Sequence, residues 1–113
     1  MHEMGVVLTI VSTAERAAKS NNAFKVSGIV LQIGELSGVL PHFVEVCWPA
    51  AIQNSMLEEA KLVIEVIPGL GTCMACGEEY NILQHEATCP SCTAQEWDPL
   101  SGREVMIKEI AVE

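Results

Sequence analysis

Four cysteines in the second half of the chain constrain its fold more than any other feature. Two C-x2-C pairs, separated by a twelve-residue spacer, comprise Cys73, Cys76, Cys89 and Cys92. Such pairs can place four thiolates around one ion at about 2.3 Å, the arrangement of a closed tetrahedral zinc site. The spacing therefore predicts a structural Zn(II) site with no open position for a substrate.

The residues beside the cysteines favour tight turns. Gly77 follows the first pair, where a metal-binding turn commonly needs a positive φ, and Pro90 restricts the second pair. Thr93 stands at the equivalent position of the second pair and lacks the conformational freedom of glycine. Both surroundings are consistent with a metal-binding module.

Length and hydropathy predict one small core with a metal-stabilised appendage. The chain has 113 residues, of which 50% are hydrophobic. Its longest apolar runs, such as Val26 to Ile33 and Leu62 to Ile67, are far shorter than the roughly 18 residues that cross a bilayer. The N-terminus lacks the basic and apolar regions of a signal peptide, so we expect a cytoplasmic protein with reduced thiols and no membrane partner.

The charge distribution argues against nucleic-acid binding. The net charge is -9, from fifteen acidic and six basic residues. No Lys or Arg lies between Lys61 and Arg103, and the acidic residues there are Glu65, Glu78, Glu79, Glu86, Glu96 and Asp98. Phosphate backbones would be repelled by this segment, because binding them requires basic residues. Solubility explains the acidic surface more simply than a specific attraction for cations.

Hydrophobic periodicity predicts a helix followed by a strand. Between Met4 and Asn21 the apolar residues recur every three to four positions, as on a helix with one buried face. These residues are Met4, Val7, Leu8, Val11, Ala14 and Ala18. From Lys25 to Gly34 the pattern is that of a strand, with Ile29, Leu31 and Ile33 on one face.

Further elements complete an α+β fold. After a turn over Gly34–Gly38, Pro41 is placed to start a second helix, which Pro49 is expected to kink or break. Strands are predicted for Lys61–Ile67 and Arg103–Val112, the latter returning to the first sheet. In this last strand we expect two faces, one with Val105 and Ile107 and the other with Met106 and Ile110.

This pattern divides the chain into two domains. A three-stranded sheet with two helices is expected from residues 1–69 together with residues 103–113. A zinc-ribbon-like zinc domain, residues 70–102, interrupts it.

Met1-His2-Glu3 forms a second candidate site. Three nitrogens can bind one ion here: the α-amine, the following backbone amide and the imidazole of His2. They close adjacent chelate rings in one plane, a geometry that Ni(II) and Cu(II) prefer, whereas zinc has no such preference. Binding displaces protons from the amine and the amide, so affinity should rise with pH. A frayed, solvated terminus is the alternative explanation.

Several segments together resemble the HypA family (HypA/HybF), nickel metallochaperones of nickel-iron hydrogenase maturation. They are Met1-His2-Glu3-Met4, Ile33-Gly34-Glu35-Leu36-Ser37-Gly38, the two cysteine pairs and Ser101-Gly102-Arg103-Glu104. The resemblance covers essentially the whole chain. It implies nickel at Met1, His2 and Glu3, structural zinc at the four cysteines, and an α/β nickel domain interrupted by the zinc domain.

The resemblance also implies partners. Family members work with the GTPase HypB to deliver nickel to the hydrogenase large subunit, and some serve urease, so no catalysis is expected. The segments Leu40–Phe43, Cys47–Pro49 and Trp97–Pro99 depart from the usual pattern, and detailed partner contacts are not carried over to them. The motifs leave open HypA or HybF, hydrogenase or urease, monomer or homodimer, and the fourth nickel ligand.

Two other classes of protein compete with a nickel carrier. A thioredoxin-like oxidoreductase needs one reactive C-x2-C pair at a helix start, whereas both pairs here lie in turn-rich sequence. A zinc-ribbon adaptor without a nickel role stays open, and it predicts that the first three residues are dispensable. Cys47 is expected to be a buried apolar residue, and His42 and His85 are expected at the surface.

Overall fold

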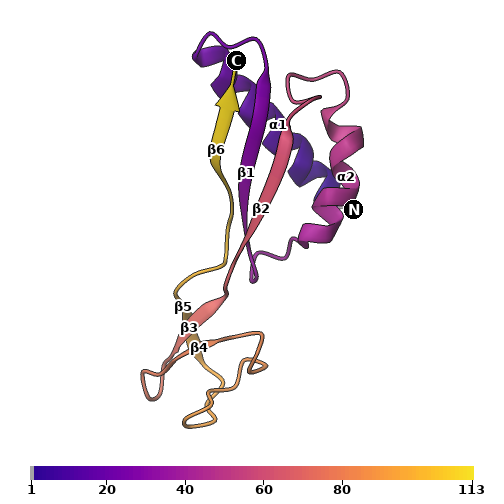
Figure 1. Ribbon diagram of the computed structural model, residues 1–113. Helices are drawn as coiled ribbons and strands as arrows, with labels where there is room; N and C mark the ends of the chain where they lie inside the picture. Colours follow the sequence, from indigo (N-terminus) through magenta and orange to yellow (C-terminus); the bar gives the residue numbers. More distant parts are fainter. Residues whose placement is uncertain (1) are drawn as a thin grey trace.

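The computed structural model describes residues 2–113, except for the side chain of His2. Figure 1 shows an elongated molecule of 54 × 27 × 17 Å, with the helices and one sheet at one end and a smaller sheet at the other. In chain order the elements are α1 (His2–Ser20), β1 (Val26–Gly34), α2 (Pro41–Ile52), β2 (Lys61–Ile67), β3 (Leu70–Cys73), β4 (Glu79–Asn81), β5 (Trp97–Pro99) and β6 (Val105–Val112).

The larger sheet has the strand order β2-β1-β6, and its core face lies toward the helices. β1 is parallel to β2 and antiparallel to β6. Ile29, Leu31 and Ile33 are buried on the core face of β1, as their alternation predicts. The predicted α+β class, with a three-stranded sheet and two helices, is confirmed.

The buried face of α1 differs from the prediction at one position. Val7, Val11, Ala14 and Ala18 are buried as expected, but Leu8 is exposed and Ile10 is buried instead. Ile10 lies three residues after Val7, so it shares the face that packs on the core.

Of the two effects expected of Pro49, a kink or a break, the structure excludes the break of α2. The helix continues to Ile52, and Trp48 and Ala51 are buried on either side of the proline. Packing of these two residues offsets the hydrogen bond that proline cannot donate. Cys47 is also buried, which confirms its apolar role.

The strand β6 contains an irregularity that corrects another prediction. Leu31 pairs with Ile107 and Val30 pairs with Glu109, so Lys108 is an extra residue in β6. Such a bulge reverses the alternation of faces beyond it. Ile110 therefore packs against the core with Val105 and Ile107, and not on the face of Met106.

The smaller sheet has the order β4-β3-β5 and its own apolar cluster. Both partners of β3 are antiparallel to it. The buried members of the cluster are Cys73, Tyr80, Ile82 and Cys89. The cysteine pairs thus lie in a separate layer at the far end of the molecule from the helices (Figure 1).

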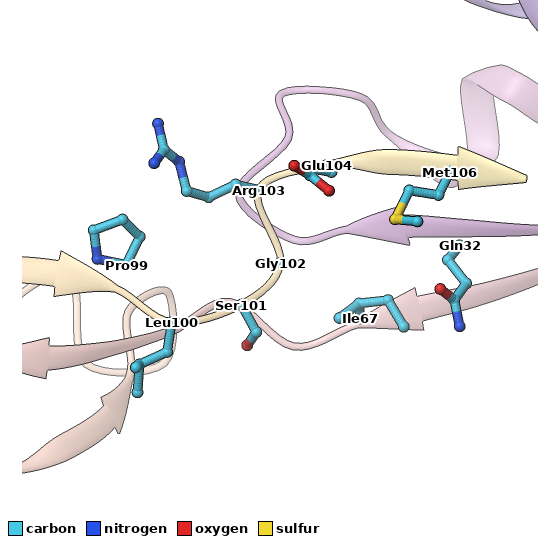
Figure 2. Close-up of a pocket in the computed structure, with 9 residues that line it drawn as sticks. All are labelled: Gln32, Ile67, Pro99, Leu100, Ser101, Gly102, Arg103, Glu104 and Met106. Carbon is cyan, nitrogen blue, oxygen red and sulfur yellow. The ribbon is translucent and has the colours of Figure 1, made fainter. Parts of the chain in front are cut away.

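Two glycines allow the chain to cross between the sheets. Gly102 has φ +82°, and a Cβ there would lie 2.6 Å from the carbonyl oxygen of Pro68. A Cβ on Gly34 would overlap the Gly102 carbonyl, which accepts a hydrogen bond from the Leu36 N–H at 2.7 Å. Figure 2 shows Gly102 in the connection that leads from Pro99 to Met106, past Ile67. This close backbone packing holds the two sheets together.

Candidate metal centre

The sulfur atoms of the four cysteines converge as the sequence predicts. All four Sγ atoms lie within 4.8 Å of one another. Cys73 Sγ is 3.5 Å from Cys92 Sγ, and Cys76 Sγ is 3.6 Å from Cys89 Sγ. Ligands at about 2.3 Å from a tetrahedral ion would be roughly 3.8 Å apart, so the cluster has the size of a Zn(II) site. All four are free thiols.

Each cysteine pair closes a tight backbone turn. The N–H of Gly77 donates to the Cys73 carbonyl, and the N–H of Thr93 donates to the Cys89 carbonyl, both at 2.9 Å. The φ values of Gly77 and Thr93 are 81° and 65°. The two turns therefore use the same left-handed conformation, although a β-branched residue occupies the second. The Thr93 hydroxyl donates to the adjacent Cys92 carbonyl at 2.5 Å.

The small sheet positions the buried half of the site. Cys73 ends β3 and pairs with Trp97 of β5. The N–H of Cys73 donates to the Glu78 carbonyl at 2.8 Å, and the N–H of Cys89 donates to the Ala94 carbonyl at 2.9 Å. Cys73 and Cys89 are buried, whereas Cys76 and Cys92 are exposed. An ion at the centre would be covered on one side and reachable on the other.

The electrostatics of the cluster favour a bound cation. Hydrogen bonds, foremost that from the backbone N–H of Cys76, lower the pKa of the Cys73 thiol to about 7, although burial opposes this effect. At Cys76 the N–H of Glu78 favours the thiolate, but the Cys89 sulfur, burial and the other two sulfurs together raise the pKa to about 12. Four neighbouring thiolates repel one another, and a divalent cation between them would remove that repulsion.

Tyr80 is a residue of this site that the sequence analysis missed. Its ring is buried in the cluster, and burial, followed by the charges of the four cysteines, raises the pKa of its phenol. The exposed His85 lies edge-on to it, with ring centroids 5.9 Å apart. The only local sign of this buried ring in the sequence is that a tyrosine lies in the spacer between the two cysteine pairs.

The N-terminal candidate site is only partly visible. Met1 lies outside the described residues, and His2 is the first residue of α1. Glu3 is 7% exposed, so its side chain is directed into the protein. The proposed chelate uses the α-amine, an amide and an imidazole, and it does not require that carboxylate. Nickel binding at Met1, His2 and Glu3 stays a prediction.

The profile of the family described as "Hydrogenase/urease nickel incorporation, metallochaperone, hypA" matches residues 1–112. The chain belongs to the HypA family. It is similar to the hydrogenase maturation factor HypA of Geobacter metallireducens, with 39% identity over 100% of both chains. The corresponding factor of Chlorobium luteolum is 35% identical over 100% of this chain and 97% of its own.

A solved structure agrees with the fold of this HypA-family chain. It is the solution structure of the Ni metallochaperone HypA from Helicobacter pylori, with a TM-score of 0.71 and 23% identity. The likeness covers 99% of this chain and 97% of that one, and at this identity it supports the fold. Neither helix described in residues 2–113 is long and apolar enough to cross a membrane.

Glu35 connects the two sheets of this HypA-family chain. Its Oε1 accepts a hydrogen bond from the Gly69 N–H at 2.8 Å and one from the Asn81 amide at 3.0 Å. These two donors, the Gly69 N–H foremost, lower the pKa of the carboxyl from its ordinary value. The side chain therefore bridges the turn after β1 to the beginning of β3 and the end of β4. Sequence analysis assigned Glu35 only to a family segment, because its partners are distant along the chain.

Proposed function

We propose that this HypA-family chain binds Ni(II) through Met1, His2 and Glu3 and delivers it for the maturation of nickel-iron hydrogenase. The observation that carries the proposal is the family match over residues 1–112, which includes the terminal segment. A terminal chelate suits a carrier, because its ligands can be exchanged with an acceptor. The cysteine site has no open coordination position for such an exchange, because its four thiolates complete a tetrahedron.

The second metal in this proposal is a structural Zn(II) ion held by Cys73, Cys76, Cys89 and Cys92. The sulfur distances of 3.5 and 3.6 Å and the thiol electrostatics support it. Two buried members of the small apolar cluster are themselves cysteines, so the metal would supply much of the stability of this part. We accordingly assign residues 70–102 to a zinc domain and residues 1–69 with 103–113 to a nickel domain.

The proposed partners are the GTPase HypB and the hydrogenase large subunit, with urease as a further acceptor. The chain is a carrier in this scheme and not an enzyme. We place it in the cytoplasm, where thiolates stay reduced and available for metal. The acidic stretch between Lys61 and Arg103 supports a protein partner over a nucleic acid.

A nickel titration of the zinc-loaded, untagged protein tests this function. We expect one equivalent to bind with the visible absorption of planar Ni(II), and an extra glycine ahead of Met1 to abolish that binding. Intact mass should first confirm that Met1 is retained, since the large side chain of His2 is expected to prevent its removal.

The chain offers matched controls, because it has three histidines. His2→Ala should abolish nickel binding, whereas His42→Ala and His85→Ala, both at exposed positions, should not change it. A glycine added after Glu113 should also be neutral. Equal binding by the native and extended N-termini, or binding by neither, would refute the terminal chelate and favour a zinc-ribbon adaptor.

A further inference from the structure

The helix α2 is apolar on more than its buried face. Of its twelve residues, from Pro41 to Ile52, only His42 and Glu45 have polar side chains. The core covers Val44, Cys47, Trp48 and Ala51. A helix whose apolar residues extend around its circumference normally has a second covered face.

A stripe of exposed apolar residues runs along this helix. We call Phe43, Val46 and Ala50 the α2 stripe; their spacing of three and four residues places them on one side of the helix. Phe43 is 39% exposed and Val46 is 60% exposed, and Ala50 is also exposed. Leu40, at the N-cap, adds another exposed apolar side chain beside the start of the stripe.

The segments that form α2 and precede or follow it contain acidic residues but no lysine or arginine. Residues 1–15 and 26–60 contain no Lys or Arg. Of their six acidic residues, Glu3 is buried and Glu15 is half-buried, whereas Glu35, Glu45, Glu58 and Glu59 are exposed. A partner for this region should therefore combine apolar side chains with basic residues around them, because a surface of like charge would be repelled.

We propose that the α2 stripe is the docking surface for an amphipathic helix of a partner protein, with an apolar face bordered by lysine or arginine. α1 packs against α2, and the N-terminal end of α1, which begins at His2, lies beside α2 in Figure 1. A partner on the stripe would thus be held next to the proposed nickel ligands. A role of this docking in nickel transfer rests on the proposed function, whereas the docking itself does not.

Two synthetic peptides can test the charge and shape of the partner. One is a leucine–lysine amphipathic helix, and the other has glutamate at each lysine position. The ¹⁵N-labelled, zinc-loaded protein is titrated with each, and affinity is measured by calorimetry. We expect the basic peptide to shift the amide signals of α2 and the first turns of α1, and the acidic peptide to shift neither.

Matched substitutions separate the stripe from the general acidity of the protein. Phe43→Ser and Val46→Ser should each weaken binding about tenfold, as for central interface residues. Phe24→Ser and Val66→Ser remove equivalent side chains, 75% and 53% exposed, from the α1–β1 connection and β2. These two variants should bind within about twofold of the parent protein.

Several outcomes would overturn the proposal. Shifts spread over all acidic surfaces, or equal losses in the stripe and control variants, would indicate nonspecific charge binding. Self-association of the free protein that Val46→Ser abolishes would mean that a second copy covers the stripe. Nickel binding is measured on the same variants and should not change. A protein that docks the peptide but binds no nickel refutes only the proposed function, and the reverse result refutes only the docking.

Discussion

Replacement of Thr93 by glycine should tighten zinc binding. Thr93 holds a φ of 65° in the second cysteine turn, where Gly77 performs the same task in the first. The left-handed conformation costs an L-residue about 1–2 kcal/mol. Glycine removes this cost but adds about 0.5–1 kcal/mol of backbone entropy. The Thr93 hydroxyl bond is exposed, so water can replace it. The net gain is about 0.5–1 kcal/mol, or roughly two- to fivefold in affinity.

Competition with a chromophoric zinc chelator measures the change in zinc affinity. The affinity reports on Thr93 because the cysteines bind the ion only when the turn has its folded conformation. Ser91→Gly is the matched control. Ser91 lies in the same turn, but its φ is not positive. We expect it to weaken zinc binding slightly through backbone entropy alone. If Thr93→Gly weakens binding as much as Ser91→Gly does, the strain assigned to Thr93 is wrong.

Three further predictions concern the joined sheets. Gly102→Ala should destabilise the protein in urea by about 2–5 kcal/mol, because it combines a positive φ with overlap against Pro68. Gly38→Ala should cost only about 1–2 kcal/mol, because Gly38 also has a positive φ, +80°, but a Cβ added there would have no neighbouring atom within 4 Å. Glu35→Ala should destabilise the protein equally at about pH 7 and pH 5.5, because a carboxyl with a lowered pKa contributes above its unfolded pKa and loses that contribution only as pH falls through its folded pKa. If Glu35→Ala no longer destabilises the protein at about pH 5.5, or if Glu45→Ala destabilises it as much, the stabilising role assigned to the Glu35 hydrogen bonds is wrong. Chelation should expose the amides of residues 70–102 to hydrogen exchange while the helical circular dichroism persists; simultaneous loss of both would show that the parts unfold together.

Sequence reasoning was most accurate where the relevant residues are close in the chain. Spacing alone is enough to predict the cysteine cluster, and the positive φ of Gly77 follows from the turn that the first pair makes. The three long strands are also predicted from their local sequences. By contrast, Leu8 and Ile10 are both apolar, and only packing decides which of them is buried.

The remaining features depend on distant partners. The face of Ile110 follows from the extra residue Lys108, which is defined only by pairing with β1. Glu35 meets donors 34 and 46 positions away. The strands β3, β4 and β5 have three or four residues each, too few for a reliable periodic pattern. No local signal in the sequence specifies these contacts.

The insertion of the small sheet between β2 and β6 bears on the order of folding. β2 follows β1 closely in the sequence, so these two strands can pair early. The pairing of β1 with β6 brings together residues that are far apart in the chain, such as Val26 and Val112. If Thr72 pairs with Asp98 first, the flexible loop between β2 and β6 becomes shorter. The pairing of β6 with β1 then closes a shorter loop, which costs less conformational entropy. A metal ion that gathers the inserted segment would therefore accelerate completion of a sheet that contains none of its ligands.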